Sequence, residues 1–237
     1  MSAAVDKLIA ELRSLGTESI KKVLMKHGAK EPFFGVKIEQ LKKIQKRIKK
    51  DHALSLALYD TGVSDAMYLA GLISEPRAMT KAQLTKWLKG AYWHMLSCYT
   101  VPWVASESRF GFELARDWIE SPKEQVAAAG WCTWASLLSI KPDEELDHSE
   151  IEQLLKRVQK EIHTAPNRVK YTMNNFVIAV GTYVPALAAK AKAVGKAMGV
   201  VEVDMGDTSC QVPSAVAYIE KVEKMGRQGK KRKTAMC

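Results

Sequence analysis

The sequence predicts an all-α fold, and three observations lead to this prediction. Apolar residues recur at the helical spacing of three to four residues along nearly the whole chain. Glycine and proline fall between these periodic segments. Proline also falls at their starts, where its missing backbone N–H costs a helix nothing. The segments are short and closely spaced, which predicts antiparallel helix pairs. Periodicity alone leaves open whether the pairs form a bundle or stack as a solenoid, because no strict repeat is visible.

The helices expected in the first half of the chain are bounded by caps and breakers. Thr17 is a predicted N-cap, Gly28 a predicted stop, and Glu75-Pro76 a predicted break. The helix that follows Trp93 should end before Pro102. The expected ranges are 3–15, 17–27, 36–50, 51–59, 64–74, 80–90 and 93–99.

The second half continues the helical pattern with one exception. Its expected helices span 104–120, 122–139, 149–163, 166–180, 185–198 and 213–225. Residues 200–212 are instead β-branched and alternating, and Gly206-Asp207 can form a two-residue turn. This register places Val203 opposite Cys210, so the sequence predicts one short β-hairpin here.

Length and cysteine usage predict the domain organisation and the compartment. We expect residues 1–226 to form a single domain, followed by a flexible basic tail at 227–237, and we expect a monomer. No apolar stretch is long enough for a membrane span, and the N-terminus lacks the pattern of a signal peptide. The scattered thiols favour a reducing compartment, cytoplasmic or nuclear. They are Cys98, Cys132, Cys210 and Cys237.

The charge of the chain is positive and uneven. The net charge is +10 and the isoelectric point is about 9.4. Residues 1–50 carry +8 and residues 224–237 carry +6, so the middle of the chain is mildly acidic. Basic ends of this kind raise the expectation of a polyanionic partner, either nucleic acid or an acidic membrane surface.

Two basic segments are candidate phosphate contacts. The 36–50 helix has seven basic residues and one acid, Glu39, so its outer face could neutralise phosphates without reading sequence. The tail carries the run Lys230 to Lys233 between glycine and the end of the chain, and it could add phosphate contacts or serve as a nuclear address. For both segments the alternative is a solvated surface.

The aromatic cluster at 92–103 could stack on bases or on a sugar, although core packing is the commoner fate of such side chains. Asp204, Asp207 and Cys210 could suggest a metal loop, but the predicted hairpin accounts for them better. No sequence motif for nucleophilic, metal or dinucleotide chemistry is present, so the residues alone support neither an enzyme nor a cofactor.

Three segments carry a family resemblance. Residues 33–37 (FFGVK) lead into a basic helix, Tyr92-Trp93 opens a helix that ends near Pro102, and residues 168–183 read RVKYTMNNFVIAVGTY. Together they resemble the DNA alkylation repair family, the AlkD-like HEAT-repeat DNA glycosylases, over about residues 18–200. The resemblance implies an α-solenoid of HEAT-like helical pairs with a concave basic face that cradles duplex DNA. The segment 204–213 and the basic tail indicate a distinct branch of that family.

The resemblance also implies a catalytic set, and this chain departs from it. Family glycosylases place a Trp four residues before an Asp that stabilises the sugar cation. Here Trp93 matches the tryptophan, but Ser97 stands at the acid position. The family's arginine falls at Val126, and its second pocket tryptophan at Asn175 or the next residue. A neutral hydroxyl cannot replace the carboxylate. We therefore expect that the catalytic set is lost and that the DNA-binding surface is kept.

The leading hypothesis is therefore a DNA-binding protein of this family that binds damaged or branched duplex DNA without base excision. The alternatives are an active glycosylase that releases N3-methyladenine or N7-methylguanine, and a helical protein-interaction scaffold. We expect localisation with DNA, at the nucleoid of a bacterium or in a eukaryotic nucleus. The predicted DNA-binding residues are Lys37, Lys42, Lys43, Lys46, Arg47, Lys50, Trp93, His94, Arg168, Lys170, Lys230, Lys231, Arg232 and Lys233.

Overall fold

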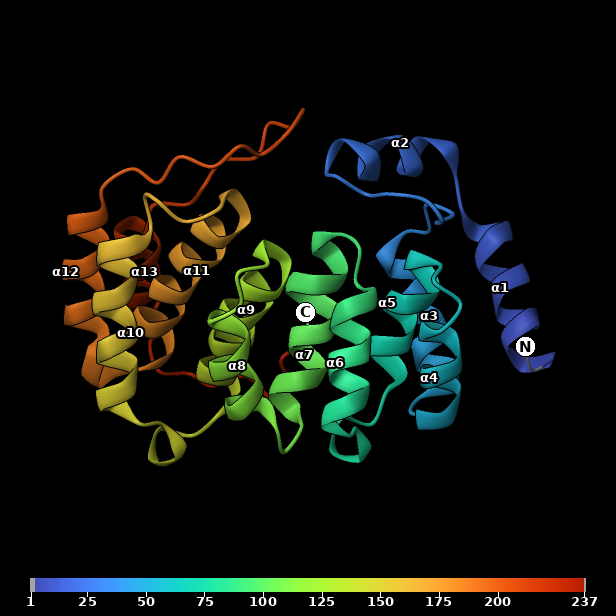
Figure 1. Cartoon of the computed structure of the whole chain (residues 1–237), viewed down its shortest axis with the longest axis horizontal. Coiled ribbons are helices and arrows are strands. Elements are labelled where there is room, and N and C mark those ends of the chain that lie inside the picture. The colour runs from blue at the N-terminus through green and yellow to red at the C-terminus, as the bar shows by residue number, and fades with distance from the viewer. Residues whose placement is uncertain (1–2, 237) are drawn as a thin grey trace. The chain divides into compact units, whose positions relative to one another are not determined.

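A computed structural model describes residues 3–236 of the chain (Figure 1). Within that range it contains thirteen α-helices, four short 3₁₀ or π segments and no β-strand. The all-α prediction is therefore confirmed. Cys237, the last of the four cysteines, lies outside the described residues. The chain divides into two compact units, residues 3–109 with 206–208 and 236, and residues 110–205 with 209–235. The prediction that residues 1–226 form one domain stays a prediction.

Unit 1 is a set of short helices around a core that includes Trp87, stacked on Tyr59 at 4.1 Å between ring centroids. Local capping sets several boundaries, as expected. Thr17 accepts a hydrogen bond from the backbone N–H of Ile20, and Thr80 forms a reciprocal capping box with Gln83. Its helices are α1 (Ala3–Leu15), α2 (Glu18–Lys26), α3 (Ile38–Ile48), α4 (His52–Tyr59), α5 (Ser64–Ile73), α6 (Lys81–Gly90), the π-helix Leu96–Thr100 and α7 (Val101–Glu107).

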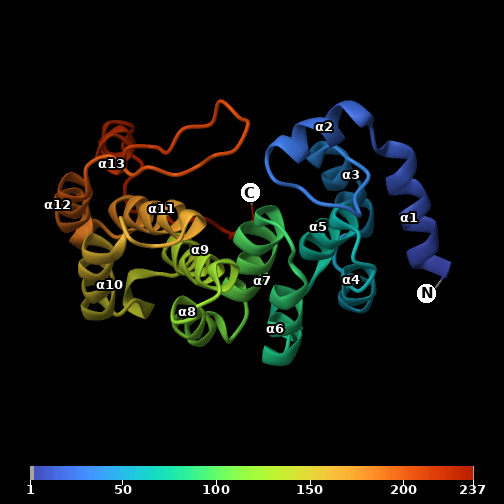
Figure 2. The ribbon, with the colours of Figure 1, turned by 45° about the horizontal axis from the view of Figure 1, so that its top comes forward.

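Unit 2 consists of three helical pairs. Figure 2 shows one row made by α8, α10 and α12, and a second row made by α9, α11 and α13. Gly130 of α9 allows close packing on α8, because a Cβ there would lie 2.6 Å from the backbone nitrogen of Ile119. The helices are α8 (Gly111–Ile119), α9 (Glu124–Ile140), α10 (His148–Glu161), α11 (Asn167–Tyr183), α12 (Ala188–Met198) and α13 (Ala215–Lys224).

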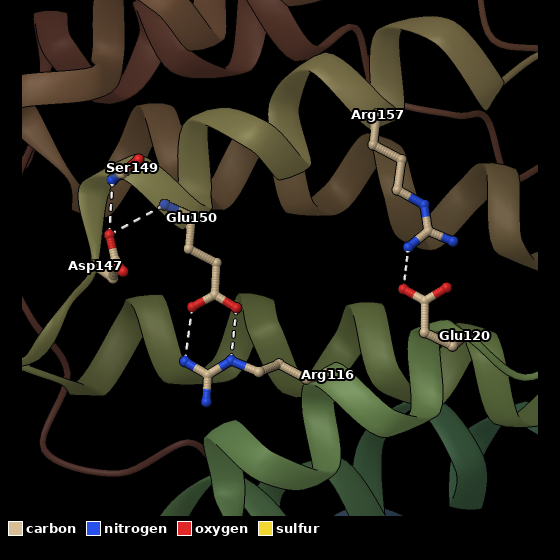
Figure 3. Close-up of polar contacts among 6 residues, drawn as sticks. All are labelled: Arg116, Glu120, Asp147, Ser149, Glu150 and Arg157. Carbon is tan, nitrogen blue, oxygen red and sulfur yellow. Dashed lines mark hydrogen bonds and ion pairs between the residues drawn. The ribbon is translucent and has the colours of Figure 1, made fainter.

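Ion pairs cross between the outer helices of unit 2 (Figure 3). Arg116 on α8 forms a bidentate pair with Glu150 at 2.6 and 2.7 Å, and Arg157 on α10 reaches back to Glu120. Glu152 on α10 pairs with Lys190 on α12. Successive helical pairs are thus joined by charged contacts on the outside as well as by apolar packing inside.

The predicted hairpin at 200–212 is wrong. None of these residues is in a strand, and the backbone N–H of Thr208 bonds to Gly206, two residues back, instead of across a hairpin. The physical reason is visible at Asp204, whose backbone N–H and C=O both bond to the side chain of Asn167, at 2.7 and 2.8 Å. An asparagine from α11 thus satisfies groups that a partner strand would have taken.

The single helix predicted over 104–120 is also wrong, because α7 ends at Glu107 and α8 begins at Gly111. Ser108 takes an extended conformation, and its hydroxyl donates to the carbonyl of Ala105 at 2.7 Å. A serine that bonds its local backbone in this way competes with the helical ladder, and nothing in the periodicity of the sequence signals it.

No single helix among residues 3–236 is long and apolar enough to cross a membrane. The segments Asn167–Tyr183 and Pro185–Met198 reach that length and composition only when taken together, and a bend of 116° separates them.

Candidate nucleic-acid interface

The loop that precedes α3 is fixed by a buried carboxylate. Asp65, on the first turn of α5, accepts the backbone N–H of Phe34 at 2.6 Å and that of Val36 at 2.8 Å. Burial raises the pKa of this carboxyl, while the N–H donors oppose the shift. Sequence reasoning missed Asp65, because an acid among apolar residues on a short helix gives no sign of its partners.

The Tyr92-Trp93 segment packs inward against the same loop. The Trp93 indole N–H donates to the Ser64 hydroxyl at 2.7 Å, and the Tyr92 hydroxyl donates to the carbonyl of Pro32 at 2.8 Å. Trp93 is only 7% exposed, and His94 is half-buried beside it, edge-on at 5.2 Å between ring centroids. Trp93 is therefore almost entirely shielded from bulk solvent, and its indole N–H is held by Ser64.

Ser97 lies in the π-helix that follows Trp93 and is also buried, at 3% exposed. Its hydroxyl donates to the Trp93 carbonyl at 3.3 Å and touches Cys98. The π-helix adds one residue to the turn, so that the N–H of Val101 bonds five residues back to Leu96.

The other two positions of the expected catalytic set lie in unit 2. Val126 is half-buried in the first turn of α9, and Asn175 is half-buried on α11. Neither side chain can stabilise a cation as a carboxylate would, nor does either offer an aromatic face. None of the four positions of the expected catalytic set holds an exposed acid or an exposed tryptophan. No group of three or more histidine, cysteine or acidic residues suited to a metal ion occurs among residues 3–236.

The basic residues of α3 divide into paired and unpaired cations. Arg47 forms a bidentate pair with Glu11 at 2.6 and 3.0 Å, and Lys43 pairs with Glu39 at 2.8 Å. The Lys50 ammonium donates to the Leu72 carbonyl at 3.1 Å, and burial lowers its pKa. Lys42 and Lys46 form no ion pair within the described part of the chain. They and the exposed Lys37 and Lys49, which flank the helix, are therefore the cations of this segment with charge to offer a phosphate.

The candidates on α11 lie near its first turn. The Arg168 guanidinium lies over the Tyr171 ring at 5.4 Å. The backbone N–H of Arg168 donates to the Glu124 carboxylate at 2.6 Å. Lys170 is half-buried. Glu124 therefore occupies one of the helix N–H groups that could otherwise receive a phosphate.

The C-terminal segment differs from the flexible tail expected of it. The Lys231 ammonium donates to the carbonyls of Leu138 and Tyr183, at 3.0 and 2.8 Å, and pairs with Asp143 at 2.8 Å. The backbone N–H of Arg232 donates to Ser139 at 2.7 Å. Residues 227–235 therefore bind the ends of α9 and α11, and Lys231 is committed to those contacts. Lys230 and Lys233 remain exposed.

Comparison with known proteins agrees with this architecture. The sequence model of the family described as DNA alkylation repair enzyme matches residues 8–198.

The chain belongs to the DNA alkylation repair family.

Two curated relatives, Lmo0209 of Listeria monocytogenes and Lin0241 of Listeria innocua, are each 33% identical to it over 222 residues. Those alignments cover 91% of this chain and 96% of each relative, and both relatives are described as uncharacterised.

A solved structure is similar along its whole length. It superposes with a TM-score of 0.90 at 38% identity and covers 98% of this chain and 99% of its own. That protein is described as one of "a new family of proteins related to the HEAT-like repeat DNA glycosylases with affinity for branched DNA structures". The HEAT-like helical-pair fold that the resemblance implied is thereby confirmed, and so is membership of the family.

Proposed function

We propose that this member of the DNA alkylation repair family binds branched or damaged duplex DNA through its exposed cations and does not excise bases. The solved relative, similar over nearly the whole of both chains and described as having affinity for branched DNA, carries the binding part of the proposal. The unpaired Lys42 and Lys46, with the exposed Lys37, supply charge for phosphates. On this proposal the protein acts as a monomer and is found with the nucleoid of a bacterium or in a eukaryotic nucleus.

The burial of Ser97 carries the non-catalytic part. A sugar cation forms where the enzyme meets the nucleotide, so its stabilising group must reach the surface. Here the acid position holds a neutral hydroxyl that is turned inward and bonded to the Trp93 carbonyl. A glycosylase of this family would need another acid, and no carboxylate lies between Tyr92 and Glu107.

Binding to duplex DNA should depend steeply on salt, and Lys42→Gln with Lys46→Gln should flatten that dependence. The slope of log K against log salt should fall by about 0.9 for each phosphate that is no longer neutralised. Fluorescence anisotropy with one labelled duplex at several salt concentrations measures it. Lys190→Gln with Lys192→Gln is the matched control, because it removes the same two charges from lysines already paired with Glu152 and Glu223. Affinity that is absent, or flat with salt, would favour the scaffold alternative.

The wild type should release no measurable N3-methyladenine or N7-methylguanine from methylated duplex DNA, and Ser97→Asp should not create that activity. The new carboxylate would lie in the interior without a cation, so the variant should instead lose about 2–4 kcal/mol of stability. Chromatography of released bases and urea denaturation measure the two results. Ser97→Ala separates loss of the hydroxyl from burial of charge. Robust base release by the wild type would establish the glycosylase alternative.

A further inference from the structure

Unit 1 contains an apolar cavity that the core side chains leave unfilled. Its volume is about 240 Å³, many times the share of about 30 Å³ that one water takes in the liquid. One wall is formed by Ile20, Val23 and Leu24 on α2. The lining also includes the aromatic side chains of Phe33, Tyr68 and Trp93.

The packing of α2 leaves this cavity open. No residue of α2 is buried, although the helix is amphipathic, and its apolar side faces the cavity instead of a neighbouring helix. Val23 is 50% exposed and Ile38, also in the lining, is 36% exposed. An open, mostly apolar pocket with a few polar groups is the usual form of a small-ligand site, and exposed apolar surface of this kind is seldom retained without a use.

Charge at the cavity indicates what it would hold. Lys37, exposed at the start of α3, is part of the lining. The Lys21 ammonium lies 5.3 Å from the centroid of the Phe33 ring but is paired with Glu31 at 2.5 Å, so the unpaired charge near the cavity comes from Lys37 and Lys22. Lys22 is exposed on the same helix and has no ion-pair partner within residues 3–236. Aromatic walls inside a cationic rim complement a nucleotide, whose base is planar and apolar on its faces and whose phosphate is anionic.

We infer that this cavity takes an unpaired nucleobase from the DNA, as found at a branch point or a bulge. The inference rests on the proposed DNA binding and deepens it, because it says how branched DNA would be preferred to a paired duplex. A base that is already unpaired enters without the cost of breaking a pair and a stack. Asp65 already accepts two backbone N–H groups, so the recognition depends on stacking and accepts any base.

Val23→Trp tests the inference by filling the cavity from a position that is 50% exposed. Stacking of one base on aromatic side chains contributes about tenfold to the affinity. The affinity of the variant for a three-way junction with unpaired bases should therefore fall about tenfold. Its affinity for a paired duplex of the same length should not change. Met25→Trp is the matched control, since Met25 lies on the same helix at 54% exposed but outside the cavity lining.

A second measurement follows the base directly. A junction with 2-aminopurine at an unpaired position should change its fluorescence when wild type or Met25→Trp binds, and should not change it with Val23→Trp. If Val23→Trp keeps full junction affinity and the fluorescence change, the cavity assignment is overturned while the proposed DNA binding stands. If the wild type binds neither DNA at low salt, the proposed function itself fails. Loss of binding to anionic phospholipid vesicles in Val23→Trp alone, with DNA unaffected, would reassign the cavity to a lipid.

Discussion

Removal of residues 227–237 is expected to destabilise the protein strongly, because the C-terminal segment braces unit 2. The truncation deletes the Lys231 contacts with Leu138, Tyr183 and Asp143, and the backbone hydrogen bonds from Arg232 and Gly229. With about 0.5–1.5 kcal/mol for each bond, the free energy of unfolding should fall by about 3–5 kcal/mol. That corresponds to about 6–20 °C in Tm for a chain of this size.

A point substitution isolates the central contact of this brace. Lys231 places a cation at the C-terminal ends of α9 and α11 at once, where the terminal carbonyls and the helix dipoles favour positive charge. Lys231→Met should therefore cause a large part of the loss in free energy of unfolding that the truncation causes. Thermal and urea denaturation measure this loss. Lys233→Met is the control, because Lys233 is an exposed lysine two residues further along. A truncated protein with an unchanged melting temperature would restore the picture of a flexible arm.

Asp65→Ala is expected to be the most damaging single substitution in unit 1. It removes the acceptor of the Phe34 and Val36 N–H groups and leaves both donors, which lie in a largely buried loop, without that partner. Each orphaned donor costs about 1–3 kcal/mol, so the variant should lose about 2–5 kcal/mol in urea denaturation.

Asp65→Asn is the matched variant for this carboxylate. Its amide keeps one oxygen for one N–H and turns an N–H₂ toward the other, so about half of the loss should remain. The pH dependence has a definite sign. Because burial raises the pKa of Asp65, the folded state binds its proton more tightly than the unfolded state does. Its contribution to the free energy of unfolding should then be largest in acid and fall as pH rises through the raised pKa. Equal stability of wild type and Asp65→Ala would contradict this account of the loop.

Local chemistry was enough to predict much of the fold. The apolar spacing placed most helices within a few residues, and Thr17 caps its helix as its residue type predicts. These features depend on hydrogen bonds within one turn and on one amphipathic face, so neighbouring residues determine them. The resemblance of a few segments then indicated the family and its helical-pair architecture, which the comparisons confirm.

Other features depended on partners far away in the sequence. The segment 200–212 has the pattern of a hairpin, yet Asn167 takes the backbone groups of Asp204. The tail has the composition of a flexible arm, yet Lys231 donates to backbone carbonyls at the ends of two helices.

The candidate site depended on the tertiary structure most of all. The residue types at Trp93 and Ser97 can be read from the sequence, and their chemistry already argued against catalysis. Whether those side chains meet solvent was decided by the π-helix and by the bond from Trp93 to Ser64, which turn them inward. The free charge of α3 was likewise decided by which basic residues find an acid across space, as Arg47 does with Glu11. Sequence determined which groups this protein has, and long-range packing determined which of them remain available to a ligand.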